Sequence, residues 1–484
     1  MTLSLVRNFV NGDFVTSSSP TLDVTNPANG SLLAKVPLGT KLEVDLAVKA
    51  AKEAFPAWSE TPPAQRIQYL FKMKELMESH FEEIATLVTK EHGKVLAEAR
   101  GDVRRGIDNI DQAVGIPNLM MGECLENVGP GIDCMAFARP MGVFAAIVPF
   151  NFPAMVPFWF LPYAIATGNT FVLKPSEQVP LTQEFLCELW QKTGLPKGVL
   201  NTVNGAKEVV DTICTHPDVV GVSFVGSTPV AKHVYTLATQ TGKRVQALGG
   251  AKNFMIIMPD AHMEKSAAMV AESCYGCAGQ RCLAASVVLA VGEEAHKAIV
   301  PPILAYAKAL KVGDGLKDGV QIGPVISAKS KERILKLIDN AQNQGAKIIL
   351  DGRKAPESTH PEGYFLGPTV IDGVTADMEI AREEIFGPVL CISKVDSLDE
   401  VHAIMNSHPC ANTTSIYTQN GASARAFYHK TVPSMIGINI GVPAPMSYFG
   451  FGGAKDSFFG DIKAHGRYGV EFYTDKKVVI QRWF

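Results

Sequence analysis

The 484-residue sequence has no excess of charge of either sign. Lysine and arginine together number 45, and aspartate and glutamate number 48, which gives a formal net charge of −3. Such a surface has no general attraction for nucleic acid or for an anionic membrane. We therefore expect no nucleic acid and no membrane as partners, and any anion has to be bound by a few placed arginines.

The sequence also contains no segment typical of a secretory leader or a membrane span. Residues 1–15 include Arg7, Asn11 and Asp13 and have no long apolar core, unlike a signal peptide. Residues 141–169 are apolar enough to raise the question of a transmembrane helix, but several prolines divide them into short pieces. We predict that the protein is cytoplasmic.

Nine cysteines are scattered through the chain. In a large chain without a secretory signal, this distribution indicates reduced thiols. Cys274 and Cys277 have the spacing of a zinc or redox pair, but there is no second pair and no pair of histidines at zinc-ligand spacing. We interpret both cysteines as core residues of an apolar helical run and predict no metal site.

What the sequence does contain is two long series of alternating elements, with no internal repeat, low-complexity run or disordered linker. Near-continuous apolar strands separated by amphipathic helices indicate parallel sheets covered on both faces, which is an α/β fold. The first series predicts strands at 142–148, 170–174, 198–203, 219–225 and 244–248 and helices at 153–167, 180–193, 206–215 and 228–241. The second series predicts strands near 254–258, 286–291, 346–350, 389–395, 413–417 and 435–439.

Elements of other kinds flank these two series. Residues 9–14 predict a hairpin, because apolar residues flank an Asn-Gly pair. Residues 469–480 alternate like an exposed strand, and an exposed strand usually pairs with another edge. Helices are predicted at 42–58, 63–90 and 96–113.

One short joint between a predicted helix, 264–271, and a predicted strand, 286–291, contains a candidate nucleophile. Cys282 closes the sequence Gly-Gln-Arg-Cys, and the neighbouring Arg281 would favour the thiolate, which is the reactive form of cysteine. A buried, inert cysteine is the ordinary alternative, since free cysteines mostly act as small hydrophobes. From these residues alone we favour the inert interpretation.

Five segments in the same order resemble those of the aldehyde dehydrogenase superfamily, and the resemblance extends over essentially the whole chain. These segments are Pro-Phe-Asn-Phe-Pro at 149–153, Lys-Pro-Ser-Glu at 174–177, Ser-Phe-Val-Gly-Ser at 223–227, Gly-Gln-Arg-Cys at 279–282 and Glu-Glu-Ile-Phe-Gly-Pro at 383–388. Within the superfamily the chain is most similar to the CoA-acylating methylmalonate-semialdehyde dehydrogenases.

The resemblance implies a three-part organisation. A Rossmann-type NAD-binding domain would comprise residues 1–121 and 139–248, and an α/β catalytic domain would comprise residues 249–460. A small β oligomerisation arm would comprise residues 122–138 and 461–484. The family is built as homo-oligomers, so we expect a dimer or a homotetramer.

The resemblance also implies the catalytic residues. Cys282 attacks the aldehyde, and the side-chain amide of Asn151 forms an oxyanion hole with the backbone N–H of Cys282. Arg105 and Arg281 match the residues that hold the substrate carboxylate in the methylmalonate-semialdehyde subfamily, and a guanidinium is well shaped for that group. A solvated helix face is the usual alternative for an arginine such as Arg105.

The cofactor implied by the resemblance is NAD, although the chain lacks a Gly-x-Gly-x-x-Gly after its first strand. Lys174 would bind the adenosine ribose, and the carboxylate of Glu177 would repel the extra phosphate of NADP. Glu384 would bind the nicotinamide ribose. Gly226 and Ser227 open a helix suited to the pyrophosphate. Further cofactor positions are Val148, Phe150, Gln178, Gly249 and Phe386.

One departure from the family pattern bears on the second half of the reaction. Hydrolytic members carry a glutamate that activates water, and we place Ala247 at the matching position. Alanine cannot accept a proton, whereas the thiol of CoA is partly ionised at neutral pH and needs less help than water. The sequence therefore predicts CoA as co-substrate and an acyl-CoA product, although no CoA-binding motif is legible.

Taken together, we expect NAD-dependent, CoA-acylating oxidation and decarboxylation of malonate or methylmalonate semialdehyde to acetyl-CoA or propanoyl-CoA. The nearest alternative is a CoA-independent dehydrogenase that oxidises another anionic aldehyde, a carboxylate or a sulfonate, to the free acid. A catalytically silent protein on the same fold is a further alternative. Residues 437–443 depart from the proline-richer loop of the subfamily beside the substrate, so the semialdehyde stays open.

Overall fold

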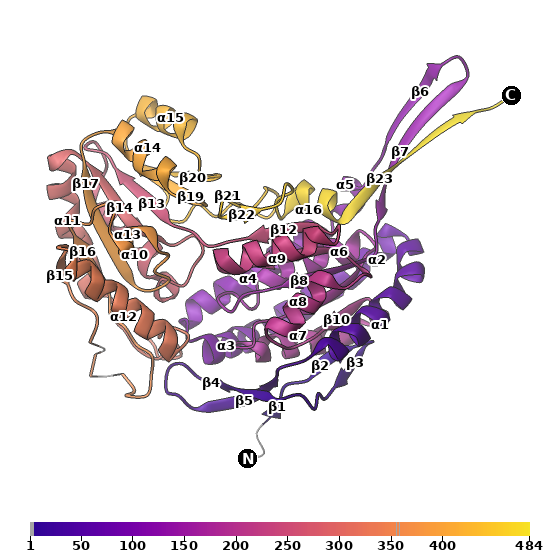
Figure 1. Ribbon diagram of the computed structural model, residues 1–484, viewed down its shortest axis with the longest axis horizontal. Helices are drawn as coiled ribbons and strands as arrows, with labels where there is room; N and C mark the ends of the chain where they lie inside the picture. Colours follow the sequence, from indigo (N-terminus) through magenta and orange to yellow (C-terminus); the bar gives the residue numbers. More distant parts are fainter. Residues whose placement is uncertain (1–3, 355, 358) are drawn as a thin grey trace.

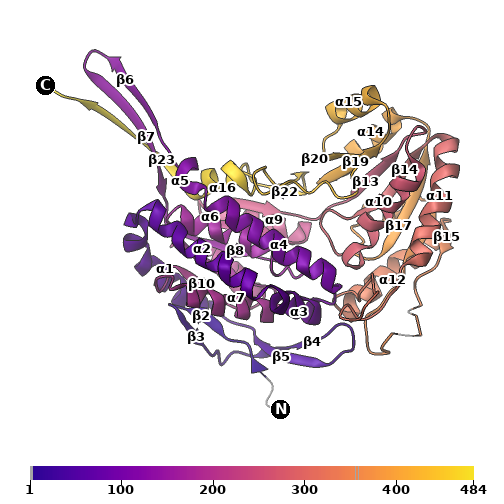
Figure 2. The same ribbon diagram turned by 180° about the vertical axis from the view of Figure 1, so that it is seen from behind.

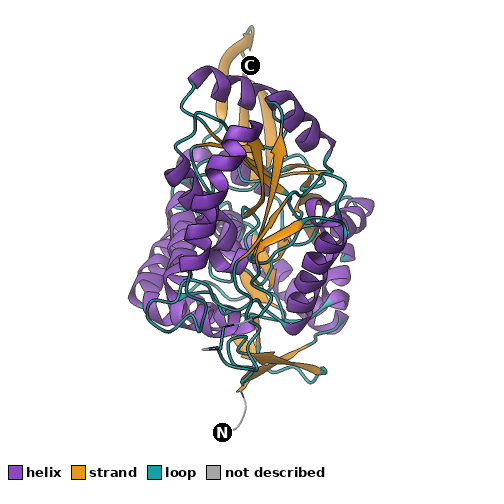
Figure 3. Ribbon diagram, turned by 90° about the vertical axis from the view of Figure 1, so that its left-hand side faces the viewer, coloured by secondary structure: helices purple, strands orange, loops and turns teal. Residues whose placement is uncertain are grey.

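The computed structural model describes residues 4–354, 356–357 and 359–484. Two α/β bodies stand next to each other, and a long β arm projects from the larger one (Figure 1). Viewed at a right angle to this, the strands run through the middle of the molecule with helices on both sides (Figure 3). The predicted α/β class is confirmed.

The larger body is built on an eight-stranded sheet in the order β22-β12-β11-β8-β9-β10-β2-β3. Its five central strands are parallel, and the outer strands β22, β2 and β3 each pair antiparallel with the neighbouring strand. Strands such as β8 and β9 are buried at every residue, which explains their uninterrupted apolar sequences. The strands are β2 (Asn8–Val10), β3 (Asp13–Val15), β8 (Val143–Ile147), β9 (Thr170–Lys174), β10 (Leu200–Thr202), β11 (Val219–Val225), β12 (Arg244–Leu248) and β22 (Phe458–Phe459).

Helices cover both faces of this sheet, and each face has its own apolar core (Figure 2). One face packs against α1 (Lys41–Glu60), α8 (Lys207–Thr215) and α9 (Thr228–Gln240). The other face packs against a thicker helical layer. Cys282, the candidate nucleophile, packs against the apolar core of this face. That layer consists of α2 (Pro63–Ser79), α3 (Phe81–His92), α4 (Leu96–Ala113), α5 (Ile116–Leu119), η1 (Val156–Trp159), α6 (Leu161–Ala166) and α7 (Pro180–Thr193).

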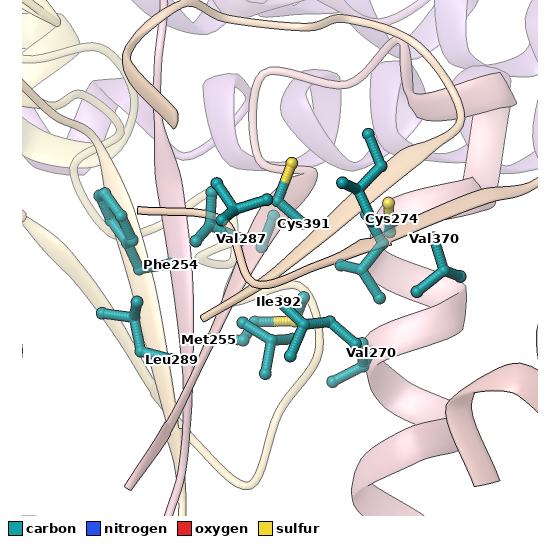
Figure 4. Packing of buried hydrophobic residues seen from close by; sticks show 14 of the residues in the cluster. Phe254, Met255, Val270, Cys274, Val287, Leu289, Val370, Cys391 and Ile392 are labelled. Carbon is teal, nitrogen blue, oxygen red and sulfur yellow. The ribbon is translucent and has the colours of Figure 1, made fainter. Parts of the chain in front are cut away.

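The smaller body is built on a seven-stranded sheet in the order β15-β16-β17-β14-β13-β19-β20, parallel except at β15. Its core joins strand residues such as Val287 and Ile392 to Val270 and Cys274 of the preceding helix (Figure 4). The strands are β13 (Asn253–Ile257), β14 (Ala285–Val291), β15 (Lys347–Leu350), β16 (Thr369–Asp372), β17 (Val389–Val395), β19 (Thr413–Tyr417) and β20 (Met435–Ile438). The helices are α10 (Met263–Tyr275), η2 (Gly276–Gly279), α11 (Gly292–Ala309), α12 (Ala328–Asn343), α13 (Glu379–Arg382), α14 (Leu398–Ser407) and α15 (Gly421–Lys430).

Three smaller sheets complete the chain. The arm is β6 (Glu123–Gly129), β7 (Ile132–Pro140) and β23 (Thr474–Arg482), with β7 in the middle, and it carries the C-terminus. Near the N-terminus β5 pairs with two neighbours, and a two-stranded ladder lies near the C-terminal end of the smaller body. These elements are β1 (Ser4–Leu5), β4 (Thr21–Thr25), β5 (Leu32–Pro37), β18 (Cys410–Ala411) and β21 (Ala454–Lys455).

The predicted elements are mostly found, with three corrections. The single helix predicted at 63–90 is two helices that meet at His80. Prolines reduce the helix predicted at 153–167 to the short turns η1 and α6. The exposed strand predicted from residue 469 begins only at Thr474, because residues before it form α16 (Gly466–Tyr473) with an apolar buried face. The strand β16 was not predicted.

In the described part of the chain, no helix is both long and apolar enough to cross a membrane. The division into three domains that we expect from the resemblance stays a prediction.

Candidate active site

Cys282 follows a short loop with strained backbone. After α10 ends, Cys277 and Ala278 have positive φ of 51° and 53°, and Gly279 has φ of 74°. Left-handed backbone is costly for residues with a side chain and marks a position that its surroundings enforce. A Cβ on Gly279 would lie 2.1 Å from the carbonyl oxygen of Gly387, so only glycine permits this contact. The loop therefore packs backbone to backbone against the Glu-Glu-Ile-Phe-Gly-Pro segment.

A buried carboxylate from the helical layer holds both ends of this loop. Glu98 in α4 accepts hydrogen bonds through one oxygen from the backbone N–H of Cys277 at 2.6 Å and from Nη2 of Arg281 at 2.9 Å. Nε of Arg281 also lies 3.3 Å from Sγ of Cys277. The sequence did not point to Glu98, because nothing in its own helix distinguishes it from a solvated glutamate.

The charge of Arg281 acts on Cys282 in the expected direction, but other effects outweigh it. Burial, followed by the negative charge of Glu384, raises the pKa of Cys282 to about 12. The N–H groups of Cys282 and Leu283 and the charge of Arg281 act in the opposite direction without overcoming this rise. The guanidinium of Arg281 is engaged by Glu98 and Cys277, so its effect on the neighbouring thiol is small.

Asn151 is brought against the nucleophile loop, as expected. It lies in the turn after β8, is buried, and its Nδ2 donates to the carbonyl of Gln280 at 3.1 Å. Its own carbonyl accepts from Nζ of Lys94 at 2.6 Å. Lys94 is fully buried and forms a 3.1 Å ion pair with Asp102 of α4. This pair was not predicted, although a buried aspartate at an apolar helix position is a signal that could have found it.

Asn253 and Asn412 fix the backbone at the nucleophile itself. The Nδ2 atoms of these two residues donate to the carbonyl of Cys282 at 2.9 Å and 3.0 Å respectively. Cys282 thus follows a strained turn and is anchored from β13 and from the segment before β19. Together with Asn151, these contacts leave the Cys282 side chain partly buried.

The residue that faces Cys282 from β12 is residue 248 and not residue 247. Side chains alternate between the two faces of a strand, and Ala247 lies in the core on the face covered by α1, α8 and α9. Its neighbour Leu248 lies on the opposite face, in the apolar cluster against which Cys282 packs. The prediction from Ala247 was therefore wrong about the residue. Leucine, like alanine, cannot accept a proton, so neither residue 247 nor residue 248 supplies a carboxylate.

Glu384, in the segment at 383–388, also lies close to Cys282. Its Oε1 accepts from the backbone N–H of Ala251 at 3.1 Å, and burial raises its pKa to about 7. A Cβ on Gly250 would lie 2.6 Å from Oε2 of Glu384, so a larger residue there would displace this carboxylate. Phe386, with φ of 50°, packs edge-on against Phe150 at 5.9 Å between ring centroids.

The remaining predicted cofactor residues gather at the carboxyl ends of parallel strands of the larger sheet, where open sheets of this type bind ligands. Nζ of Lys174 lies 2.9 Å from Oε2 of Glu177 just after β9. Gly226 and the exposed Ser227 stand at the start of α9, whose first turn has no side-chain cap. Uncapped N–H groups of this kind suit a pyrophosphate. Val148 and Gly249 also lie at this edge, directly after β8 and β12, and Gln178 lies in the connection between β9 and α7.

The two arginines differ in their partners. Arg281 is paired with Glu98, whereas the partly buried Arg105 of α4 has no ion-pair partner among residues 4–354, 356–357 and 359–484. The adjacent Arg104 pairs with Glu78 at the surface, so it points away from this region. Of the two arginines, Arg105 is therefore the one whose positive charge is not engaged in an ion pair in the described residues.

No group of three or more potential metal ligands is found in the described residues. Cys274 and Cys277 are buried, and burial raises the pKa of both thiols, which disfavours the thiolate that a metal needs.

A candidate nucleophilic cysteine after a strained loop, an asparagine amide beside that loop and a nucleotide-type sheet edge are the features of an α/β oxidoreductase. The comparisons make this specific. The chain matches the aldehyde dehydrogenase family over residues 14–479 and belongs to that family.

Individual relatives match over nearly the full length. A malonate-semialdehyde dehydrogenase 2 of Geobacillus kaustophilus is 49% identical over 479 residues, 99% of each chain. The crystal structure of a methylmalonate-semialdehyde dehydrogenase from Oceanimonas doudoroffii has a TM-score of 0.98 at 44% identity, with 99% of each chain covered. A Sinorhizobium meliloti protein assigned as a methylmalonate-semialdehyde dehydrogenase, solved in complex with NAD, has a TM-score of 0.98 at 40% identity and covers 100% of this chain and 98% of its own. The resemblance noted from the motifs is confirmed.

Proposed function

We propose that the protein oxidises malonate or methylmalonate semialdehyde with NAD and transfers the product to CoA, giving acetyl-CoA or propanoyl-CoA. The observation that carries the proposal is that Leu248 lies in the apolar cluster against which Cys282 packs. A thioester on Cys282 lacks the nearby glutamate that hydrolytic relatives use, because Leu248 occupies the face of β12 that packs with the nucleophile. The relatives at 40–49% identity support the same substrate class.

The first steps use the geometry around Cys282. Its sulfur attacks the aldehyde carbon, and the oxygen that becomes negative is stabilised by the amide of Asn151 and the N–H of Cys282. Bound NAD would supply the hydride acceptor and a positive charge that favours the thiolate. Glu384, Phe386 and Phe150 would border that ring, and the edge at Lys174, Glu177 and Ser227 would hold the rest of the cofactor.

The later steps follow from the thioester. Its β-carboxylate leaves as carbon dioxide, and the electron pair moves into an enolate that the thioester carbonyl stabilises before protonation. The CoA thiol then attacks the carbonyl carbon, and the Cys282 sulfur leaves as thiolate. Arg105 would bind the carboxylate before it is lost. Arg281 would share in this only if it released Glu98.

Product analysis tests this function. NADH formation from malonate semialdehyde is followed with and without CoA. Sustained turnover only with CoA, giving acetyl-CoA and carbon dioxide, is the expected result. Equal turnover without CoA, giving the free acid, would replace the proposal with the hydrolytic alternative.

The arm supports assembly as a homo-oligomer, because its outer strands carry exposed apolar side chains that a second subunit would cover. These are Leu125 and Val128 on β6 and Val478 and Ile480 on β23, followed by Trp483. We propose a dimer or tetramer formed through this arm, to be checked by light scattering.

We also propose a cytoplasmic location, which the nine free cysteines support.

A further inference from the structure

His465, at the start of α16, is a buried histidine whose ring makes no hydrogen bond. The residue is 3% exposed, and neither ring nitrogen has a partner in the described chain. Its backbone is also strained, with φ of 73°. Buried polar groups are nearly always hydrogen-bonded, and a strained non-glycine residue is retained only when its surroundings enforce it. A residue with both defects calls for a partner outside the protein chain.

The surroundings of His465 explain why the protein itself supplies no partner. Three aromatic rings enclose the imidazole: Trp159 at 5.0 Å and nearly perpendicular, Phe451 at 5.4 Å, and Tyr163 at 6.5 Å and nearly parallel. These rings belong to the apolar cluster against which Cys282 packs. The imidazole therefore borders the same apolar core as Cys282.

Arg105 is a cation without an ion-pair partner in the described residues, and it is connected to His465 through Asn109 and Tyr163. Its backbone carbonyl accepts from Asn109 at 2.9 Å, and the hydroxyl of Tyr163, whose ring stacks on His465, lies 3.4 Å from Oδ1 of the same Asn109. Burial first, and then the positive charge of Arg105, lowers the pKa of His465 to about 3, so the guanidinium is within electrostatic reach of the ring. Burial raises the pKa of Asp108, and the charge of Arg105 is the largest of the effects that oppose this rise.

We propose that His465 and Arg105 together bind the carboxylate of the semialdehyde, with the neutral imidazole donating one hydrogen bond beside the guanidinium. This inference rests on the proposed function and assigns a specificity role to His465. A donor without a hydrogen-bond partner and a cation without an ion pair in the described residues would both be satisfied by one anionic group. The aromatic rings leave the bound carboxylate little water.

A neutral donor suits the loss of carbon dioxide better than a second cation would. In the decarboxylation, negative charge leaves the carboxylate and moves to the enolate beside the thioester. A second full positive charge at the carboxylate would stabilise the starting state more than the transition state and would slow the step. An imidazole that stays neutral orients the group without that penalty.

The test compares an anionic with a neutral aldehyde in three enzymes. His465→Gly removes the ring and relieves the backbone strain, and His465→Asn keeps a donor in a residue that tolerates positive φ. For His465→Gly we expect kcat/KM to fall about ten- to a hundredfold with malonate semialdehyde and to stay within about twofold with propanal. His465→Asn should recover part of the loss. An equal loss with both aldehydes would assign His465 to packing and overturn the inference.

A binding measurement separates this inference from the proposed function. In a Cys282→Ala background, calorimetry measures the affinity for 3-hydroxypropanoate, which carries the same carboxylate but cannot react. We expect weaker binding after His465→Gly or Arg105→Gln, and a combined effect smaller than the product of the single effects. Unchanged affinity in His465→Gly would overturn the inference, whatever the products of the reaction are. Failure of CoA-dependent turnover alone would overturn only the proposed function.

Discussion

At the carboxyl ends of β9 and β11, regular strand backbone leads directly into the residues proposed to bind NAD. Around Cys282, by contrast, three consecutive residues have left-handed backbone, and the loop is held by side chains from distant parts of the chain. The first region is set by the periodic pattern of its own strands. The second depends on single contacts from α4, β13 and the segment at 383–388, so single substitutions should damage it more.

Cys282→Ala is expected to have the largest effect. Removing the nucleophile should lower NADH formation by at least about a thousandfold, because residues that act as a unit in covalent catalysis are not replaced by others. NAD affinity, measured by fluorescence quenching, should stay unchanged, since the sheet edge is not touched. Retained turnover in the variant would remove Cys282 from the mechanism.

Glu98→Gln should break the loop without touching the reacting atoms. The amide can still accept from Cys277, but it loses the charge-assisted contact with Arg281, and we expect kcat to fall about ten- to a hundredfold. The rate of alkylation of Cys282 by iodoacetamide should change with it. NAD affinity reports the sheet edge and should not move.

A matched control exists at an ion pair that also involves α4. Glu82 of α3 pairs with Arg100 of α4 at the surface, so Glu82→Gln removes a comparable ion pair that lies away from the loop. Exposed pairs of this kind contribute little, and the variant should keep full activity. If Glu98→Gln behaved like Glu82→Gln, the contacts of Glu98 with Cys277 and Arg281 would have no role in positioning Cys282.

The same contrast explains what the sequence could predict. The strands at the sheet edge are near-continuous apolar runs, so β8, β9, β11 and β12 were located closely, and the motif at 279–282 pointed to Cys282. The contact of Glu98 with Arg281 and the contact of Lys94 with Asn151 join residues about 180 and 60 positions apart, which no local pattern encodes. The misplacement of the missing base at Ala247 is an error of parity, since a shift of one residue moves a side chain to the other face of a strand.

Glu177→Ala tests the regular region and should have a smaller effect. The side chain is partly exposed, and its contact with Lys174 is one of several at the edge. We expect the KM for NAD to rise about three- to tenfold and activity with NADP to increase, because the carboxylate no longer repels the 2′-phosphate. The rate of Cys282 alkylation should be unchanged. A coupled change in both would mean that the two regions are not independent.

Glu384→Gln should have the smallest effect and the opposite sign, because it connects the two regions. The negative charge of Glu384 is the second cause, after burial, that raises the pKa of Cys282 to about 12. In enzyme without NAD, the variant should therefore be alkylated about two- to fivefold faster at pH 8, where Glu384, with a pKa of about 7, is mostly ionised in the wild type. Below about pH 6 the wild-type carboxyl is protonated, so the difference should disappear. Alkylation of both proteins should rise about tenfold per pH unit between pH 7 and 9, since the thiol pKa lies above that range. A difference that persisted at pH 5.5 would show that Glu384 acts through packing, and the two regions would then be linked by shape and not by charge.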